Sequence, residues 1–482
     1  MLYPTFKITK PIRLITLFSG YDSQALALKY LGVNFEHYKT CEWAVKSIQA
    51  LKDLHFEEDK KDYSKGIEIE QIKEFLLNKG ISSNYNDPMT QAQINRLGEK
   101  QARTIYNNIQ ATHNLVDIQQ TKGKDLCIKD KDKFTYLLTY SFPCQDLSLA
   151  GKRQGMSDTT TRSGLLWEVE RILMECRELN QLPDVLLMEN VIQVHGEGAK
   201  EDFNKWQLRL EELGYKNYWK DLIATDYGIP QTRNRCFMIS ILGDYNYTFP
   251  KPIPLKLKLK NMLENNVDEK YFLSDKMMEY ITSKDNKYKV NENNLNINRS
   301  IACSKTTREG NTRADTTDYI CDELPENFNI KNGCKQVYDL NYYNHEQSNR
   351  VYSPEYSSPT LRTKHDEAGT IKVTIGNKAL NETLEQNEID DTCYIDTYNR
   401  KIDKDKSGTI TTGVSFRNNT FLADSDLRIR KLTPKECFRL MGVKDEDYDK
   451  VAKNQSDSSL YHLAGDSIVC QGVLTSIFKE MM

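Results

Sequence analysis

Short apolar runs alternate with amphipathic stretches from Arg13 to about Phe249. The runs are rich in β-branched and aromatic residues, and they predict strands over 13–18, 35–43, 135–142, 184–190 and 235–242. Helical periodicity predicts helices over 23–30, 164–178 and 199–213. Strands that alternate with helices favour an α/β fold with a Rossmann-like, doubly wound, mainly parallel sheet, which binds ligands at the carboxyl ends of its strands.

Two segments depart from this alternation. Residues 56–115 form an insert rich in Glu, Lys, Gln and Asn, whose periodic charged faces predict solvent-exposed helices. A proline-rich step at 250–254 marks a domain boundary. From there to about Asp426 the chain is dense in Thr, Asn, Asp, Tyr and Gly, which predicts a second, smaller domain of short strands and loops. A helix that begins at Thr433-Pro434 is predicted to follow.

The composition narrows the class of protein. The chain has 482 residues, 38% hydrophobic and 28% charged, which is typical of a globular protein of two domains. A net charge of −3 neither supports nor excludes a nucleic-acid partner, because a basic face can exist under a neutral total. The 11 cysteines include no CxxC pair, so we predict no disulfide framework and no metal site. No run approaches the roughly 20 apolar residues of a membrane helix, and we expect a cytoplasmic protein without membrane contact.

Cys144 is the most distinctive candidate for chemistry. It belongs to the segment SFPCQ (141–145), directly after a predicted buried strand, and Pro143 stiffens the backbone before it. A cysteine at a strand end is well placed to act as a nucleophile that adds to an electron-poor ring and later leaves. A buried structural thiol is the alternative interpretation.

The ends of the first two predicted strands have the pattern of a nucleoside site. Gly20 forms a turn before a helix N-terminus, and about twenty residues later Glu42 stands where a carboxylate binds ribose hydroxyls. Trp43 is able to stack on an adenine. The GxGxxG fingerprint is absent, because Asp22 and Ser23 stand where glycine is expected, and an ordinary core is the alternative.

Two further motifs add polar groups to the same predicted sheet edge. Glu189 in MENV (188–191) ends an apolar strand, where a shielded carboxylate can hold and donate a proton. Arg233 and Arg235 stand at alternate positions that enter the next strand, so they share one face suited to a carbonyl or a phosphate. A surface glutamate and a solvated arginine pair are the alternatives.

These motifs occur in the order of a known family, and the chain resembles the cytosine-C5 DNA methyltransferases. The resemblance is carried by FSG (18–20), EW (42–43), VDI (116–118), SFPCQ (141–145), RSGLLWEVERIL (162–173), MENV (188–191), YGIPQTRNR (227–235), RKLTPKECFRLMG (430–442) and AGDSIV (464–469). It covers most of the chain outside the insert and the middle of the second region. Asp22 and Asp466 depart from the family, which usually has glycine and asparagine at these positions beside the cofactor.

The resemblance implies transfer of a methyl group from S-adenosyl-L-methionine to C5 of cytosine in double-stranded DNA. The Cys144 thiolate would add to C6 while Glu189 protonates or hydrogen-bonds N3, and elimination of the thiol would release 5-methylcytosine. Arg235 would hold the cytosine O2, and Arg233 would support a phosphate or the acidic groups of the site. Because the target base is stacked in the duplex, it must flip out into the enzyme.

The resemblance also implies the residues that contact the cofactor and the DNA. The implied cofactor residues are Phe18, Gly20, Glu42, Trp43, Asp117, Ile118, Pro143, Leu165, Asp466 and Ser467. The DNA-binding candidates are Lys152, Arg153 and Arg162 in the loop after Cys144, and Thr409, Arg417 and Asn419 in the second region. Ordinary loop solvation is the alternative for these side chains.

The implied domains are a catalytic S-adenosylmethionine-binding domain over 1–254, a target-recognition domain over 255–449 and a C-terminal segment, 450–482, that returns to the catalytic domain. We expect a monomer, and a cognate restriction endonuclease that acts on the same site is a candidate partner. Two alternatives stay open. A tRNA cytosine-C5 methyltransferase is disfavoured by the large second region, and an inactive DNA-binding relative is disfavoured by the presence of Cys144, Glu189 and Arg235.

Overall fold

The computed structural model describes residues 3–143, 163–271 and 430–482, together with short strands between 336 and 423. The chain divides into two compact units. One unit comprises 1–228, 234–254 and 441–482, and the other comprises 229–233 and 255–440. The assignment of catalytic and target-recognition roles to these parts of the chain stays a prediction.

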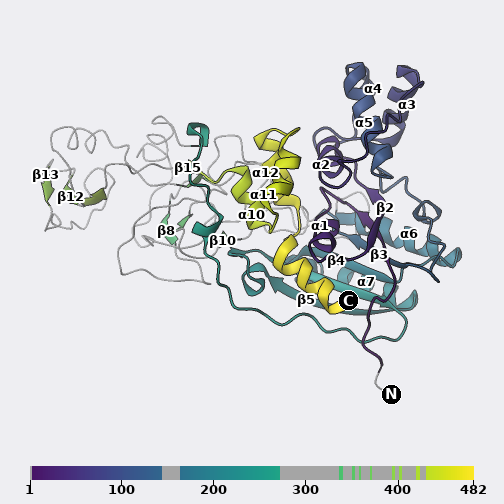
Figure 1. Ribbon diagram of the computed structural model, residues 1–482. Helices are drawn as coiled ribbons and strands as arrows, with labels where there is room; N and C mark the ends of the chain where they lie inside the picture. The colour runs from purple at the N-terminus through teal and green to yellow at the C-terminus, as the bar shows by residue number, and fades with distance from the viewer. Residues whose placement is uncertain are drawn as a thin grey trace. The chain divides into compact units, whose positions relative to one another are not determined.

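The first unit is built on a six-stranded sheet in the order β2-β1-β3-β4-β7-β5 (Figure 1). Its strands are β1 (Ile12–Leu17), β2 (Phe35–Cys41), β3 (Thr135–Tyr140), β4 (Val185–Val191), β5 (Tyr215–Ile223) and β7 (Asn234–Leu242). The first four strands in that order pair in parallel, whereas β7 is antiparallel to both of its neighbours. The predicted mainly parallel α/β sheet is therefore confirmed, with the addition of β5, which the apolar pattern did not predict.

Helices connect the strands of this sheet. The helices α1 (Ser23–Tyr30), α6 (Leu166–Glu178) and α7 (Lys200–Glu212) lie where the periodicity predicted them, whereas α2 (Val45–His55) was not predicted. The main core lies between helices and sheet, and it joins buried side chains of β3 and β4 to those of α6 and α7. Trp206 shows the quality of this packing, because its indole nitrogen donates to the hydroxyl of Tyr140 at 3.0 Å inside the core. The C-terminal helices α11 (Asp445–Ala452), α12 (Asp457–Asp466) and α13 (Thr475–Met481) complete the unit.

The insert forms a helical layer with a core of its own. It contains α3 (Ile69–Lys79), α4 (Gln91–Asn95) and α5 (Glu99–Ala111), which confirms the predicted helices. Their inner faces bury apolar residues such as Ile72, Leu76 and Ile105, while their charged faces stay exposed. In Figure 1 the helices of the insert rise above α2 and away from the sheet. The insert therefore has its own hydrophobic cluster in addition to the solvated faces that its charges predicted.

The described part of the second unit consists of short strands, one α-helix and two short 3-10 helices, η5 (Leu259–Met262) and η6 (Glu269–Tyr271). The strand pairs are β8 (Gln336–Asp339) with β9 (Arg350–Tyr352), β10 (Ser358–Pro359) with β6 (Gln231–Thr232), and β11 (Thr370–Ile371) with β15 (Arg430–Lys431). A three-stranded sheet contains β12 (Cys393–Asp396), β13 (Lys401–Asp403) and β14 (Thr420–Ala423). These elements confirm the prediction of a strand-rich second region.

The helix of the second unit, α10 (Pro434–Leu440), begins where it was predicted. Thr433 Oγ1 accepts a hydrogen bond from Glu436 N at 3.2 Å, and Glu436 Oε2 accepts one from Thr433 N at 2.7 Å. These reciprocal bonds form a capping box, which satisfies two backbone donors at the start of the helix.

None of the helices in the described residues has both the length and the apolar character of a membrane span.

Candidate functional site

Four neighbouring strands bring most of the described site candidates to one edge of the sheet. Leu17 pairs with Cys41 on one side and with Tyr140 on the other, and Tyr140 pairs with Met188. The carboxyl ends of β1, β2, β3 and β4 therefore lie side by side. The predicted residues that follow these ends are Phe18, Gly20, Glu42, Trp43 and Pro143, and Glu189 lies in the last part of β4. This placement matches the expectation that ligands of a doubly wound sheet bind at its carboxyl edge.

Glu42 joins the ends of β1 and β2. Its carboxylate accepts hydrogen bonds from the backbone N–H of Gly20 at 2.9 Å and of Ala44 at 2.8 Å. Asn114 fixes the backbone of Glu42, since its side chain accepts from Glu42 N and donates to Glu42 O. Burial, together with a smaller effect of the charge of Asp466, raises the pKa of Glu42 to about 7, although the hydrogen bonds from both backbone donors oppose this rise. Glu42 is therefore a shielded carboxylate with a pKa near neutrality.

Asp22 acts as a helix cap. Its φ of 63° lies in the left-handed region, which explains why a glycine suits this position and why aspartate is tolerated. Its Oδ1 accepts from Ala25 N at 3.0 Å, and its Oδ2 accepts from Thr16 Oγ1 at 3.2 Å and lies 3.5 Å from His37 Nδ1. Burial opposes ionisation of Asp22, but hydrogen bonding to His37 lowers its pKa below the usual value. Because the side chain is only 1% exposed, these contacts account for it without a ligand.

Asp117 and Ile118 lie in a tight loop after the insert. Asp117 accepts from Gln119 N at 2.9 Å and from Gln120 Nε2 at 3.0 Å, so its carboxylate braces the turn. Ile118 is 6% exposed and packs into the main core. These contacts fix the loop from within.

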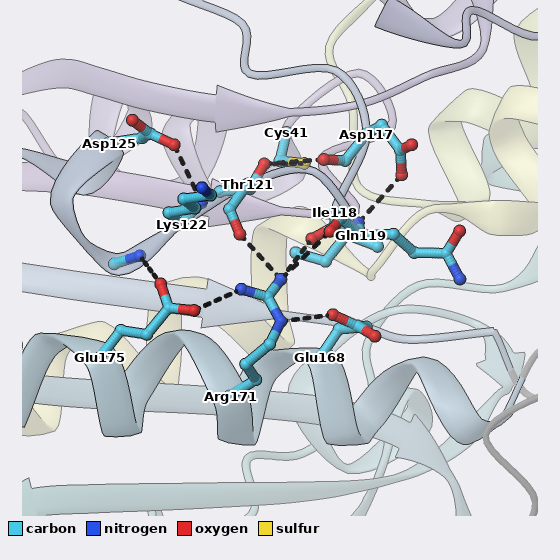
Figure 2. Close-up of polar contacts among 11 residues, drawn as sticks. Cys41, Asp117, Ile118, Gln119, Thr121, Lys122, Asp125, Glu168, Arg171 and Glu175 are labelled. Atoms are coloured by element: carbon cyan, nitrogen blue, oxygen red, sulfur yellow. Dashed lines mark hydrogen bonds and ion pairs between the residues drawn. The ribbon is translucent and has the colours of Figure 1, made fainter.

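Arg171 on α6 anchors the same loop from outside (Figure 2). Its guanidinium donates to the carbonyl oxygens of Ile118 at 3.2 Å and Thr121 at 2.8 Å, and to that of Gln119 at 3.4 Å. Glu168 and Glu175 each lie 2.8 Å from the guanidinium, and hydrogen bonds to these two carboxylates raise the pKa of Arg171 against the effect of burial. Arg171 therefore holds the backbone that carries two predicted cofactor residues.

We expect Arg171→Met to lower the free energy of unfolding by about 1–3 kcal/mol, because three backbone acceptors lose a charged donor. The side chain is 34% exposed, which allows water to replace part of these bonds and keeps the effect at this size. Urea denaturation measures the change. Arg177→Met on the exposed face of the same helix is the matched control, and it should stay within about 0.5 kcal/mol. Equal effects of the two substitutions would contradict the anchoring role.

Glu189 and Arg235 form a buried ion pair at the carboxyl end of β4. Arg235 Nε lies 3.2 Å from Glu189 Oε1, and the two side chains are 12% and 5% exposed. Ser141 Oγ donates to Glu189 Oε2 at 2.5 Å, so both carboxylate oxygens have neighbours. The sheet brings the two side chains together, because Arg235 on β7 is the register partner of Val191, which is two residues after Glu189 on the neighbouring strand β4. The structure thus brings together two of the predicted catalytic residues.

Asn190 connects this pair to the segment before Cys144. Its side-chain amide donates to Phe142 O at 3.0 Å, and its side-chain oxygen accepts from Val191 N at 2.8 Å. Asn190 is 2% exposed, so these bonds form away from water. It therefore fixes the backbone up to Pro143, the residue that precedes Cys144 in the sequence.

Several predicted site residues lie outside the described residues or apart from this edge. Cys144, Lys152, Arg153, Arg162, Thr409, Arg417 and Asn419 lie outside the described residues. Arg233 is buried and belongs to the second compact unit. Leu165 packs against the main core. Phe18 and Trp43 do lie at the edge, where Phe18 packs against the main core and Trp43 packs against the cluster of the insert.

The C-terminal end of α12 supplies the last two predicted cofactor residues. Ser467 Oγ donates to Ala464 O at 2.9 Å, which closes the end of the helix. Asp466 Oδ2 lies 2.7 Å from His462 Nε2, one turn earlier. The charge of Asp466 contributes to the raised pKa of Glu42. His462 and Tyr85 are the neighbours of this edge that sequence reasoning missed, and no local motif marks them. Ser141 belongs to the SFPCQ motif, but no role was predicted for it.

One cluster among the described residues has the chemistry of a metal site. His195, Asp221 and Cys236 place one ligand atom each within 4.8 Å of one another. A histidine, a carboxylate and a thiol suit zinc. However, His195 Nε2 lies 2.9 Å from Asp221 Oδ1, and that contact satisfies both groups without an ion.

The fold and the site define an α/β enzyme that gathers polar groups at the carboxyl ends of its parallel strands. The model of the C-5 cytosine-specific DNA methylase family matches residues 78–482, and the chain belongs to this family. It is a DNA (cytosine-5-)-methyltransferase.

Named relatives agree with this assignment. The chain is 35% identical over 307 residues to the orphan methyltransferase M.SssI of Spiroplasma monobiae, which covers 63% of this chain and 76% of the relative. It is 29% identical over 474 residues to the type II methyltransferase M2.ScrFI of Lactococcus lactis subsp. cremoris, which covers 98% and 99%. Among solved structures, the Entamoeba histolytica methyltransferase EhMeth has a TM-score of 0.50 at 14% identity, with 98% of each chain covered, and this likeness shows the fold.

Proposed function

We propose that this enzyme methylates C5 of a cytosine flipped out of double-stranded DNA, with S-adenosyl-L-methionine as methyl donor and through a covalent adduct with Cys144. The observation that carries the proposal is the buried Glu189–Arg235 pair beside the strand end that Asn190 ties to Phe142. A proton donor and a cationic hydrogen-bond donor are thereby fixed next to the segment that leads into the proposed nucleophile.

The residues at the sheet edge fit the proposed cofactor. Glu42 presents a shielded carboxylate, which suits ribose hydroxyls as donors. The turn at Gly20 is open, since a side chain built there would meet no atom within 4 Å. Phe18 and Trp43 border the same turn, and Asp117, Ile118, Pro143, Leu165, Asp466 and Ser467 are the further residues proposed to hold the cofactor. S-adenosyl-L-methionine supplies an electrophilic methyl group when it is bound.

The proposed mechanism assigns one task to each catalytic side chain. The Cys144 thiolate forms a bond to C6 of cytosine, and this addition moves electron density to C5. Glu189 donates a hydrogen bond or a proton at N3, so the density that develops on the ring is stabilised. Arg235 donates to O2 of the base while it stays paired with Glu189. C5 would take the methyl group and leave S-adenosyl-L-homocysteine. N3 then returns to Glu189 any proton it received, the C5 proton leaves to water and the C6–sulfur bond breaks, which releases 5-methylcytosine and restores the thiolate.

Contacts with DNA are proposed for the loop after Cys144 and for the second region. Lys152, Arg153 and Arg162 would bind phosphates near the flipped base, with Arg233 supporting a phosphate or the acidic groups. Thr409, Arg417 and Asn419 would read the duplex from the second region. Action as a monomer and partnership with a restriction endonuclease for the same site belong to this proposal.

Methyl transfer tests the proposal directly. Labelled S-adenosyl-L-methionine is incubated with unmethylated duplex DNA, and bisulfite sequencing locates the product. We expect label at cytosines within one short sequence, and we expect its loss with Cys144→Ala. Transfer to tRNA with none to DNA, or cofactor binding without any transfer, would overturn the proposal.

The affinity for S-adenosyl-L-methionine should rise with pH through about 7, the pKa to which burial raises Glu42. An ionised carboxylate accepts hydrogen bonds from ribose hydroxyls, whereas protonation removes acceptor capacity. If only the ionised form binds, affinity falls about tenfold per unit of pH below the pKa. Calorimetric titration at a series of pH values around neutrality measures this slope.

Glu42→Gln is the control for the pH experiment, and its weaker binding should not depend on pH over the same range. An affinity of the native enzyme that stays flat across neutrality would contradict the assignment.

The folding stability of the enzyme should change with pH in the direction opposite to the affinity. The folded protein retains a proton on Glu42 that the unfolded chain releases, so this stabilisation is complete at acidic pH and is lost as pH rises through about 7.

A further inference from the structure

The helical insert reaches the proposed cofactor site through the loop Ser82–Asp87, in addition to the contact of Asn114 with Glu42. Ser82 N donates to Trp43 O at 2.8 Å, and Val45 N donates to Ser82 O at 2.9 Å. The two bonds form a parallel bridge between Ser82 and Ala44, directly after Glu42 in the chain. The loop is therefore fastened to the turn that carries Glu42 and Trp43.

The loop is closed by its own side chains and presents Tyr85. Asn84 Oδ1 accepts from Asn86 N at 2.9 Å and Asp87 N at 3.0 Å, and Ser82 Oγ donates to Asp87 O at 2.7 Å. Tyr85 has a φ of 62°, a conformation that is strained for an aromatic residue. Strain of this kind persists where surrounding contacts impose it, and it clusters at functional sites.

Those surrounding contacts come from α12. The ring of Tyr85 lies on the ring of His462, with centroids 3.6 Å apart and planes inclined by 34°. His462 in turn lies 2.7 Å from the carboxylate of Asp466. Burial raises the pKa of Tyr85, and the charges of Asp466 and Glu42 raise it further, so both carboxylates lie within electrostatic reach of its hydroxyl. One tyrosine of the insert thus connects the two chain segments that carry these carboxylates.

We propose that Tyr85 is a positioning residue of the cofactor site, which orients Asp466 by fixing the ring of His462. The proposal rests on the function proposed above, because it takes S-adenosyl-L-methionine as the ligand. That molecule carries an ammonium and a sulfonium, and the carboxylate of Asp466 offers a complementary charge. Tyr85 covers one face of His462 and excludes water there, which strengthens the interaction between His462 and Asp466. The insert is in this way a part of the cofactor site as well as a surface module.

Tyr85→Leu tests the proposal by separating binding from catalysis. We expect the Kd and KM for S-adenosyl-L-methionine to rise about tenfold, as loss of one aromatic contact allows, while kcat at saturating cofactor stays within about twofold. Tyr85→Phe keeps the ring and should restore nearly native affinity. Tyr106→Leu is the matched control, since Tyr106 packs edge-on against Phe75 within the insert at 4.9 Å between centroids. It should leave the affinity unchanged.

A double-mutant cycle shows whether Tyr85 acts through Asp466. If it does, Tyr85→Leu combined with Asp466→Ala binds the cofactor no more weakly than Asp466→Ala alone. Additive losses, native affinity of Tyr85→Leu, or an equal loss in Tyr106→Leu would each overturn the positioning role. Failure of the native enzyme to bind S-adenosyl-L-methionine would instead overturn the proposed function, and this inference with it.

Discussion

Replacement of Cys144 by serine should lower the rate of methyl transfer to DNA by at least about a thousandfold, the scale seen when an enzyme loses its nucleophile. A serine hydroxyl stays protonated near neutral pH, and its oxygen is a weaker nucleophile toward C6 than a thiolate sulfur. The cofactor residues proposed at β1 and β2 are untouched by the change. The affinity for S-adenosyl-L-methionine should therefore remain nearly native, and single-turnover methyl transfer measures the loss in the chemical step.

A covalent adduct gives this prediction a second readout. Duplex DNA with 5-fluorocytosine at the target position lacks the C5 proton that must leave, so the C6–sulfur bond of the native enzyme cannot break after methylation. We expect a stable protein–DNA complex on a denaturing gel with native enzyme and none with Cys144→Ser. Cys127→Ser, at a partly exposed cysteine, is the control and should retain both activity and adduct. Full activity of Cys144→Ser would remove the nucleophile from the mechanism.

Local patterns predicted those parts of the fold that depend on neighbouring residues. The start of α10 follows from Thr433 and Glu436, since a capping box is written in four consecutive residues. Strand β3 was predicted because every residue of TYLLTY is apolar or small enough to be buried, and all six are buried. Strand β5 was missed because YKNYWKDLI mixes charged with aromatic residues, which reflects its place at the edge of the sheet.

The sequence predicted which residues of the site stand at strand ends, but not which side chains they contact. Glu42 and Glu189 were assigned to the carboxyl edge because each stands at the end of a predicted strand, and the sheet order places them there. The partners of these carboxylates lie far away in the sequence, as the contact between Arg235 and Glu189 shows. Periodicity carries no information about such pairs. The left-handed backbone of Asp22 was equally hidden, because it depends on the helix that the side chain caps.

Tyr85 shows the same limit for the insert. The charge and helical periodicity of the insert predicted solvent-exposed helices, and the charged faces of these helices are exposed. The contact with His462 joins residues from opposite ends of the chain, so it becomes visible only in the folded unit. A segment that interrupts a family pattern can in this way contribute to the site that the pattern defines.

Glu189→Gln should lower kcat by about a hundredfold to ten-thousandfold, the range that general acid catalysis supplies. The amide of glutamine has nearly the shape of the carboxylic acid, but it cannot transfer a proton to N3 of the base. The change also replaces the carboxyl group that lies 3.2 Å from Arg235 with an amide, which weakens the pairing of that buried guanidinium. Both effects act on the chemical step, so the affinity for S-adenosyl-L-methionine should change little.

Glu36→Gln is the matched control, because Glu36 also pairs with an arginine, Arg13, at 2.9 Å. Its side chain is about half exposed, and it lies near the amino end of β2, away from the carboxyl edge of the sheet. It should keep nearly native kcat, since an exposed pair contributes little and has no part in the reaction. Circular dichroism during heating separates a loss of chemistry from a loss of folding in Glu189→Gln. A folded Glu189→Gln enzyme with native kcat would show that the buried pair is structural, and another group would then have to stabilise the charge that develops when Cys144 adds to the ring.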